Sequence, residues 1–290
     1  EDKGIFIFAG NSNPDLADKI CAYLDLPLAG ATVSTFSDGE IQIEINENVR
    51  TKDAFVIQST CRPVNDNLVE LLLMVDALKR ASARRITAVI PYYGYARQDK
   101  KVAPRVPISA KLVADILTVA GATRIITMDL HADQIQGFFE RPVDHLYAST
   151  LFLPYLESLK LDNLTVASPD MGGSKRAYAY SKALSSDVVI CYKQRAKANV
   201  ISHMELIGDV TDKNVVLVDD LVDTAGTLTK AADLMMERGA KSVRAITTHA
   251  LLSGNAYEKI ENSKLLELIV TDSIPIQPKS DKIRVLSCAD

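Results

Sequence analysis

The sequence predicts an α/β protein made of two doubly wound domains with mainly parallel sheets. Short apolar, β-branched runs alternate with amphipathic helical stretches along the chain, which indicates strand–helix–strand units. Three of these runs recur, in the same order, in the second half of the chain. The length of 290 residues also suits two domains, because one domain usually holds roughly 100–200 residues.

The apolar runs are continuous instead of alternating with polar residues. Continuous runs bounded by turn residues are typical of strands buried on both faces, as in a parallel sheet. Right-handed helical crossovers would connect such strands. The expected strands are Ile5–Phe8, Phe55–Gln58, Ile86–Ile90, Ile125–Met128, Thr165–Ala167, Val215–Val218 and Val243–Thr247.

The recurrence predicts a duplicated domain. Residues about 160 positions apart align between the two halves: Ile5 with Leu164, Phe55 with Val215, and Ile86 with Val243. We expect the first domain to span residues 1–146 and the second 147–290. The join would lie near Asp144–Thr150, before a helix starting around Leu151.

The composition is that of an ordinary globular protein, 47% hydrophobic and 24% charged. A formal net charge of −4 argues against a nucleic-acid-binding protein, so any anion must be held by locally placed Lys, Arg, backbone N–H groups or metal. The longest apolar stretch, Leu68–Leu78, contains two acids, and the amino end lacks a signal peptide. We therefore expect no membrane contact.

The four cysteines form no CxxC pair and have no His at zinc-site spacing. We expect buried or incidental thiols in a reducing cytosol, and hence a cytoplasmic protein.

The segment Asp219–Thr227, DDLVDTAGT, follows an expected buried strand. Ligands of open parallel sheets bind outside the carboxyl ends of the strands. Two acids there suit sugar hydroxyls, directly or through a metal, and small residues before the next helix present backbone N–H groups to a phosphate. An N-capped turn would explain one Asp or Thr but not all of these polar residues.

Two more strand ends carry candidate ligands. Ser168–Arg176 holds a Gly pair that lets a ligand approach the backbone, with Asp170 available for Mg²⁺, although an ordinary Gly-rich turn looks similar. Asp129, His131 and Asp133 alternate, which puts them on one side of an extended segment. His131 is then either a structural histidine or a metal or phosphate ligand.

The first half offers two loops that suit a nucleotide. Phe36 could stack on a base, while Asp38 and Glu40 could accept hydrogen bonds from an exocyclic amine. Arg97 and Gln98 could reach the base or a phosphate. The alternative is a solvated hairpin and a basic loop.

A polar stretch between two strand-like runs contains Lys193, Arg195 and Lys197 at alternate positions. Such a stretch is either a solvated β-hairpin or a mobile cationic flap that closes on phosphates.

Together these segments resemble class I PRPP synthetases over essentially the whole chain. The similar stretches in the first half are FSDGE, STCRPVNDNLVELLLMVDALKRASA, AVIPYYGYARQDKK and MDLHADQIQGFF, and those in the second half are SPDMGG, KQRAKAN and VDDLVDTAGT. The last one, taken alone, resembles the PRPP-binding motif of type I phosphoribosyltransferases. The resemblance implies two phosphoribosyltransferase-type domains and transfer of the β,γ-diphosphate of ATP to O1 of ribose 5-phosphate.

The resemblance also implies a role for each candidate residue, with Mg²⁺ as cofactor. Lys193 and Arg195 would be the catalytic pair of the flap, and His131 and Asp170 would coordinate Mg²⁺. ATP would be bound by Phe36, Asp38, Glu40, Arg97, Gln98 and Asp99. Ribose 5-phosphate would be bound by Arg195, Asp219, Asp220, Asp223, Thr224, Ala225, Gly226 and Thr227, and the diphosphate loop would be Asp170, Met171, Gly172 and Gly173.

For the assembly, the resemblance implies a homohexamer built from dimers, with the ATP site partly shared across a subunit boundary. It also implies phosphate or nucleotide effectors. The sequence departs from the family at two places: Ala196 stands where a basic residue or Pro is common, and family members continue past the position of Asp290 with a helix and a tail that helps bind effectors.

Two other functions remain open from the sequence. A phosphoribosyltransferase that consumes PRPP would share DDLVDTAGT, but would need neither a duplicated domain nor an ATP site. A non-catalytic regulatory homologue would assemble with active synthetases, and the presence of Lys193, Arg195 and His131 argues against it.

Overall fold

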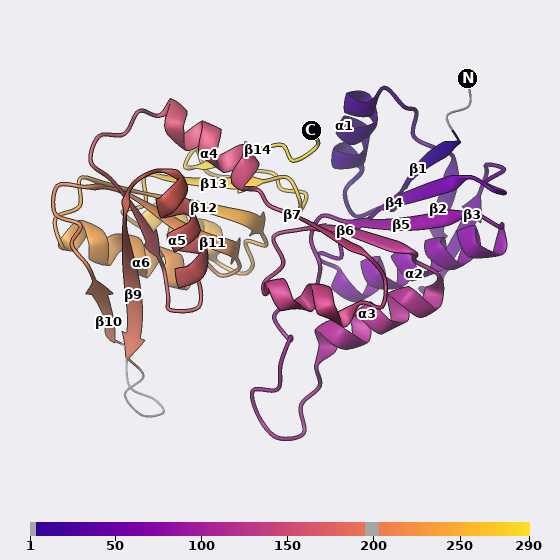
Figure 1. The fold of residues 1–290 in the computed structure, drawn as a ribbon, viewed down its shortest axis with the longest axis horizontal. Helices are drawn as coiled ribbons and strands as arrows, with labels where there is room; N and C mark the ends of the chain where they lie inside the picture. Colours follow the sequence, from indigo (N-terminus) through magenta and orange to yellow (C-terminus); the bar gives the residue numbers. More distant parts are fainter. Residues whose placement is uncertain (1–3, 195–202) are drawn as a thin grey trace. The chain divides into compact units, whose positions relative to one another are not determined.

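The computed structural model describes residues 4–194 and 203–290, which divide into two compact units (Figure 1). Unit 1 holds the chain up to Tyr147 together with Ser273–Pro275 and Ser287–Asp290. Unit 2 holds Ala148–Asp272 and Ile276–Leu286. The chain therefore crosses back into unit 1 twice near its end, which an assignment of continuous domains does not anticipate.

Unit 1 is built on a five-stranded sheet in the order β1-β4-β5-β6-β7, and every neighbouring pair is parallel. The expected parallel arrangement follows from strands such as β5, whose apolar side chains are buried almost without interruption. The strands are β1 (Ile5–Ala9), β4 (Asp53–Ile57), β5 (Arg85–Ile90), β6 (Arg124–Met128) and β7 (Val143–Leu146).

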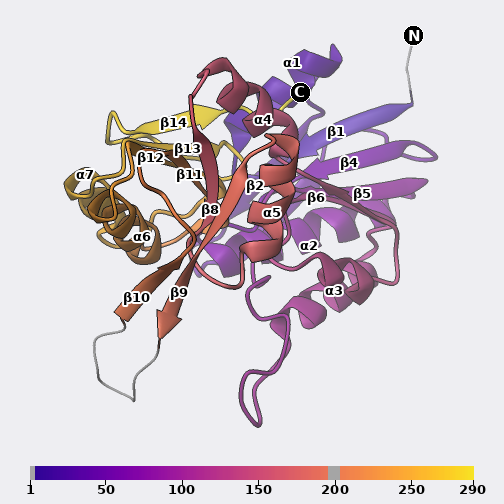
Figure 2. The same ribbon diagram turned by 60° about the vertical axis from the view of Figure 1, so that its left-hand side comes forward.

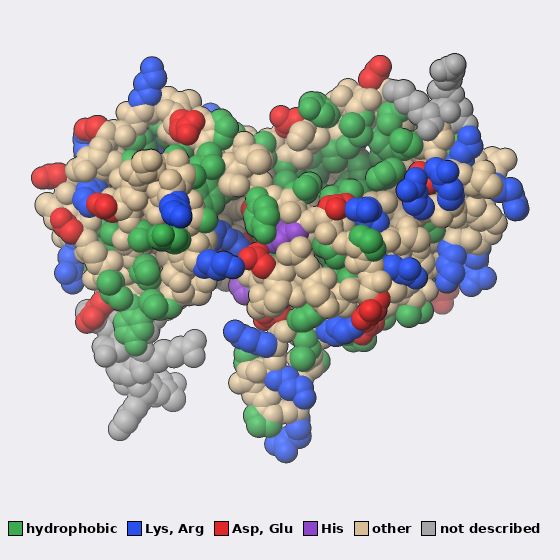
Figure 3. Space-filling view, viewed as in Figure 1, with side chains coloured by type: hydrophobic (Ala, Val, Ile, Leu, Met, Phe, Trp, Pro, Cys, Tyr) green, Lys and Arg blue, Asp and Glu red, His purple; other side chains and the backbone are tan. Residues whose placement is uncertain are grey.

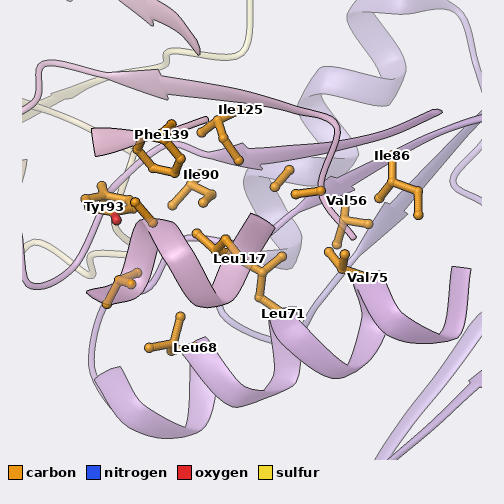
Figure 4. Packing of buried hydrophobic residues seen from close by; sticks show 14 of the residues in the cluster. Val56, Leu68, Leu71, Val75, Ile86, Ile90, Tyr93, Leu117, Ile125 and Phe139 are labelled. Carbon is orange, nitrogen blue, oxygen red and sulfur yellow. The ribbon is translucent and has the colours of Figure 1, made fainter. Parts of the chain in front are cut away.

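Helices cover both faces of this sheet. Helix α1 (Pro14–Leu24) packs on one face, and it begins where the Asn13 side chain accepts the N–H of Leu16 and Pro14 occupies the first turn. Helices α2 (Val64–Arg80) and α3 (Ser109–Ala120) cover the other face. Figure 4 shows their apolar side chains meeting those of the strands, with Leu71 and Leu117 between helices and sheet. A 3₁₀ helix, η1 (Asp133–Phe138), follows β6.

A separate antiparallel hairpin, β2 (Ala31–Thr35) with β3 (Ile41–Ile45), completes unit 1. Its turn is Phe36–Glu40, where the N–H of Phe36 donates to the Glu40 carbonyl at 2.8 Å. Gly39 takes a φ of +96°, a conformation that the turn requires and that glycine adopts without strain.

Unit 2 repeats the plan of unit 1 in a seven-stranded sheet of order β10-β9-β8-β11-β12-β13-β14. All neighbouring strands are parallel except β10 and β9. The strands are β8 (Leu164–Ser168), β9 (Asp187–Gln194), β10 (His203–Ile207), β11 (Asn214–Val222), β12 (Ser242–Ala250), β13 (Glu267–Thr271) and β14 (Ile283–Leu286). The order β8-β11-β12-β13-β14 matches that of β1-β4-β5-β6-β7, as the sequence repeat predicts.

The helices of unit 2 follow the same arrangement. Helices α4 (Ser149–Ser158) and α5 (Ser174–Ala183) precede and follow β8, and α6 (Gly226–Glu237) and α7 (Ala256–Asn262) pack on the sheet through one apolar cluster. The two copies differ in their hairpins. In unit 2 the antiparallel pair β9–β10 continues the main sheet and extends beyond it as a ribbon (Figures 1 and 2).

The expected strands all form, with two differences that bear on function. Strand β11 continues to Val222, four residues past the expected end at Val218, because β12 pairs with it as far as Ala250. Helix α4 begins at Ser149 instead of Leu151. Three of the cysteines are buried and Cys288 is partly exposed, all four as free thiols, and burial raises the pKa of Cys61 to about 11.

Among residues 4–194 and 203–290, no helix is long and apolar enough to cross a membrane.

Candidate active site

The sheet of unit 2 has its topological switch point between β8 and β11. From β8 the chain passes through α5 to β9 on one side, whereas β11, β12 and β13 follow on the other side. Crossovers that leave in opposite directions open a crevice at the carboxyl ends of the two central strands, and ligands of such sheets bind there. The segments expected to bind diphosphate and ribose 5-phosphate follow β8 and β11, so both border this crevice.

Asp219 and Asp220 lie within β11, whereas the sequence predicts that they follow the strand. Pairing with β8 ends at Leu217, while pairing with β12 continues to Val222. The two acids therefore stand on a strand that has lost one of its neighbours, which leaves this side of the backbone open. The carboxylate of Asp219 accepts the N–H of Asp220 at 2.9 Å.

The electrostatics of this acid pair favour a cation or a hydrogen-bond donor. Burial raises the pKa of Asp219 well above its ordinary value, and the charges of Asp220 and Asp170 raise it further. Arg176, in the first turn of α5, forms an ion pair with Asp220 at 3.4 Å. The surroundings of Asp219 thus disfavour its negative charge.

The loop between β11 and α6 is fixed by backbone hydrogen bonds. The N–H groups of Leu251 and Leu252 donate to the carbonyl of Val222, and that of Ser253 donates to Asp223 at 2.9 Å. Ala225 then takes a left-handed φ of 59° immediately before the helix. This turn presents the amino end of α6, with Gly226 and Thr227, at the carboxyl edge of the sheet, where a phosphate is favoured by N–H groups and helix dipole.

The loop after β8 is held by Asp170. Its carboxylate accepts the N–H of Gly173 at 3.1 Å, and its carbonyl accepts the hydroxyl of Ser168 at 2.6 Å. A β-carbon at Gly173 would lie 2.7 Å from the Ser168 hydroxyl, so this glycine is required for packing. At Gly172 a β-carbon would meet only the Asp170 carboxylate, at 3.2 Å.

In unit 1, two of the predicted loops lie side by side. Gln134 of η1 donates to the Asp99 carboxylate at 3.4 Å, which joins the loop after β5 to the loop after β6. The N–H of Leu130 donates to Nε2 of His145, and Asp129 has a positive φ of 39°. These contacts shape the turn on which His131 is exposed.

The segment 97–108 projects from unit 1 between β5 and α3 (Figure 1). Its cations Arg97, Lys100, Lys101 and Arg105 are all exposed, and Figure 3 shows Lys and Arg side chains gathered on this projection. Gln98 accepts the hydroxyl of Ser109 at 2.6 Å and so helps to start α3. The structure gives this loop both a local structural role and a positive surface.

The residues expected to bind ATP fall into two groups. Phe36 is 52% exposed at the tip of the β2–β3 hairpin, and Asp38 accepts the N–H of Glu40 at 3.1 Å. Within the described part of the chain, the hydrogen bonds of this turn stay inside it and do not reach Arg97–Asp99. In the described part of one chain, no hydrogen bond thus joins the two groups.

Comparison with known proteins decides the family. Residues 5–121 match the model of the N-terminal domain of ribose phosphate pyrophosphokinase, and residues 165–289 match that of the phosphoribosyl synthetase-associated domain. The chain is 57% identical to the ribose-phosphate pyrophosphokinase of Wolinella succinogenes, over 99% of this chain and 93% of that protein. The corresponding enzyme of Porphyromonas gingivalis is also 57% identical, over 98% and 91%.

The chain belongs to the ribose-phosphate pyrophosphokinase family. The solved structure of phosphoribosylpyrophosphate synthetase from Mycobacterium smegmatis supports the same assignment, with a TM-score of 0.94 and 42% identity over 99% of this chain and 95% of that one. The suspected resemblance and the predicted fold class are therefore confirmed.

The predicted catalytic flap lies largely outside the described residues, between Gln194 and His203. Lys193 is the second-to-last residue of β9 and pairs with Met204 of β10, and its side chain is not described. Arg195 lies outside the described residues. The catalytic role of both residues stays a prediction.

The expected metal pair also stays a prediction, because His131 belongs to unit 1 and Asp170 to unit 2. Within the described ranges, no three His, Cys, Asp or Glu residues are grouped closely enough to hold a metal by themselves. The raised pKa of Asp219 beside Asp220 and Asp170 nevertheless suits a hard cation that keeps most of its waters.

Sequence reasoning did not assign Arg176 to the site. The signal was present: Lys175 and Arg176 stand in the first turn of α5, where the helix dipole disfavours cations. A cation at that end of a helix implies an anionic partner, and the structure supplies one in Asp220.

Proposed function

We propose that this chain is a ribose-phosphate pyrophosphokinase that transfers the β,γ-diphosphate of ATP to O1 of ribose 5-phosphate, giving PRPP and AMP. One observation carries the proposal: the switch point of unit 2 gathers an acid pair, a Gly-containing loop and a partly exposed helix start at the ends of two adjacent strands. The acid pair suits the ribose hydroxyls, the loop at Gly172 suits the diphosphate, and the amino end of α6 suits the 5-phosphate.

In this mechanism the chain acts mainly by positioning and by neutralising charge. The turn from Asp223 to Thr227 orients ribose 5-phosphate so that O1 faces the β-phosphorus of ATP. O1 attacks that phosphorus, the bond to the α-phosphate oxygen breaks, and AMP leaves with the bridging oxygen. Lys193 and Arg195 would meet the charge that develops on the transferred group.

Magnesium fits this site and would neutralise the phosphate oxygens when bound. Asp170 and His131 are the residues that we propose to hold it. Asp219 and Asp220 would assist through bound water, which agrees with the direction of the Asp219 pKa.

For the assembly, we propose a homohexamer built from dimers in the cytoplasm. The separation of the Phe36 turn from Arg97–Asp99 favours an ATP site completed by a second subunit. The free cysteines suit a reducing compartment. Phosphate or nucleotide effectors remain part of this proposal.

The test is a product assay with the purified chain. AMP and PRPP should form from ATP, ribose 5-phosphate and Mg²⁺, and chelation of Mg²⁺ should stop the reaction. A phosphoribosyltransferase would instead consume PRPP with a base and would form no AMP. A regulatory homologue would be inactive alone.

His131→Ala should raise the Mg²⁺ concentration required for half-maximal rate without changing the thermal unfolding of the chain.

A further inference from the structure

Lys259 reaches the phosphate-binding turn from a different part of the chain. It lies on α7, which follows β12, and its ammonium donates to the carbonyl of Thr224 at 3.2 Å. The two residues are 35 positions apart in sequence. The contact brings a cation to the turn between β11 and α6, and its partner there is a backbone carbonyl.

The ammonium group of Lys259 lies close to Gly226, the first residue of α6. A β-carbon built on Gly226 would lie 3.7 Å from Nζ of Lys259 and 3.9 Å from the hydroxyl of Thr224. The ammonium nitrogen, the Thr224 hydroxyl and the first residue of α6 therefore border one small volume. Because Gly226 has no side chain, that volume is open to a ligand.

The charge of Lys259 is not balanced by the protein. Among residues 4–194 and 203–290, no carboxylate lies within ion-pair distance of its Nζ. The other cation of this crevice, Arg176, is paired with Asp220. An ammonium group has three donors, and the Thr224 carbonyl uses one of them. The remaining donors and the positive charge are available to an anion at the start of α6.

We propose that Lys259 is a binding residue for the 5-phosphate of ribose 5-phosphate. This inference rests on the proposed function and deepens it. The amino end of α6 supplies N–H groups, and Lys259 supplies the formal charge that a phosphate dianion needs. The hydrogen bond to Thr224 holds the long side chain in place, which lowers the entropy lost on binding.

The competing explanation is that Lys259 only ties α7 to the turn. Both explanations expect a hydrogen bond to Thr224, but they differ in what the charge does. If Lys259 is only a structural tie, replacing it should weaken the binding of ATP and ribose 5-phosphate alike, because the shape of the site changes. If Lys259 binds the phosphate, replacing it should weaken the binding of ribose 5-phosphate alone, and only a cationic side chain should restore that binding.

The experiment compares Lys259→Met and Lys259→Arg with the unchanged chain. Lys259→Met should raise KM for ribose 5-phosphate by roughly 10- to 100-fold, as expected for a lost hydrogen bond to a charged group, with KM for ATP and kcat changed less than about twofold. Lys259→Arg should restore most of the affinity. Lys241→Met is the matched control, because Lys241 pairs with Asp162 just before β12, at the opposite edge of the sheet.

Calorimetric titration with ribose 5-phosphate in the absence of ATP gives a second readout. Lys259→Met should weaken this binding by the same factor as KM, and unchanged binding would overturn the proposal. So would an equal loss in both substrates, which would indicate the structural tie. If the unchanged chain binds ribose 5-phosphate but releases no AMP, the proposed reaction fails while the role of Lys259 is still decided by the titration.

Discussion

At the scale of single residues, the turn before α6 needs a left-handed backbone conformation and open space beside the helix start. Glycine often supplies both, but here Ala225 supplies the first and Gly226 the second. Ala225 adopts the left-handed backbone conformation although it has a side chain, and Gly226 has no positive φ but leaves space beside the helix start. The backbone conformation therefore does not require glycine at this position, and we attribute Gly226 to the proposed phosphate site.

The first prediction follows from that difference. Gly226→Ala should leave the free energy of unfolding unchanged or slightly raised, since its new methyl group meets only ordinary contacts. The same methyl group would occupy the proposed phosphate volume, so KM for ribose 5-phosphate should rise by roughly tenfold or more. Gly173→Ala is the comparison: contact with Ser168 at 2.7 Å should lower stability by about 1–3 kcal/mol. An unchanged KM in Gly226→Ala would show that the volume is not used.

A second prediction concerns the pH dependence set by Asp219. Its pKa is raised in the folded protein, first by burial, so the folded state keeps the proton where the unfolded chain has lost it. The resulting stabilisation is complete below the ordinary carboxyl pKa and is lost as pH rises through the raised value. Asp219→Asn should therefore raise stability at neutral pH and flatten this decline.

Urea unfolding between about pH 2.5 and pH 8 measures the effect. Asp162→Asn serves as the control of opposite sign, because hydrogen bonding to Lys241 lowers the pKa of Asp162. Its stabilising contribution is lost as pH falls. A neutral-pH stability of Asp219→Asn below that of the unchanged chain would contradict the prediction.

At the scale of elements, the two copies of the domain treat the same loop differently. In unit 2 the loop after β8 is the proposed diphosphate loop, whereas in unit 1 the corresponding loop after β1 is occupied by the Glu70 carboxylate. The N–H and the side-chain amide of Asn11 donate to the Glu70 carboxylate at 2.5 and 3.1 Å, and Gln58 donates to it at 2.9 Å. A buried carboxylate from α2 thus takes the place that an anion would have, and unit 1 cannot repeat the site of unit 2.

The third prediction tests this internal anion. Glu70→Leu removes the acceptor of three donors in a buried setting, and each unsatisfied donor is unfavourable. We expect the free energy of unfolding to fall by about 2–4 kcal/mol. Glu70→Gln keeps one oxygen and should lose less. Chemical unfolding of both variants provides the measurement, and a Leu variant as stable as the unchanged chain would refute the role.

The fourth prediction concerns the β9–β10 ribbon, from which the proposed flap continues. If Lys193 meets charge mainly in the transition state, Lys193→Ala should lower kcat by on the order of 10²–10³ with little change in substrate binding. Arg195→Ala should act similarly, and the double variant should lose less than the sum. Lys213→Ala, which removes a contact to Asp187 at the start of β9, should leave kcat within about twofold. A near-normal kcat in Lys193→Ala would favour a solvated hairpin.

At the scale of the whole molecule, unit 1 carries apolar side chains that a single chain leaves exposed. Val69 and Leu73 stand one turn apart on α2, and Leu112 and Val119 stand two turns apart on α3, with exposed fractions from 37% to 75%. Repeated apolar positions on one helix face are typical of an interface.

The fifth prediction is that Leu112→Asp reduces the size of the assembly. A buried charge at an interface is unfavourable, so sedimentation should show smaller particles than those of the unchanged chain. ATP turnover should fall with them if a second subunit completes the ATP site. Leu266→Asp, at an exposed position before β13 in unit 2, is the control. An unchanged chain that sediments as a fully active monomer would contradict both the interface and the shared site.

The sequence by itself determined the features that depend on residues close together in the chain. The apolar runs predicted the strands and the repeat predicted the duplicated sheet order, because burial depends on the residue types of each segment. Asp219–Thr227 indicated a substrate turn, and its role stays a prediction. Strand ends depend on distant residues: β11 runs past Val218 because pairing with β12 extends it, and pairing is not a local property.

Only the tertiary structure decided which distant side chains meet. It put the switch point between β8 and β11, paired Arg176 with Asp220, brought Lys259 to Thr224, and filled the loop of unit 1 with Glu70. The physical reason is that these contacts join residues 35 to 59 positions apart, on different helices and strands. Their energies depend on how the helices pack against the sheet, and no periodicity within one segment encodes that packing.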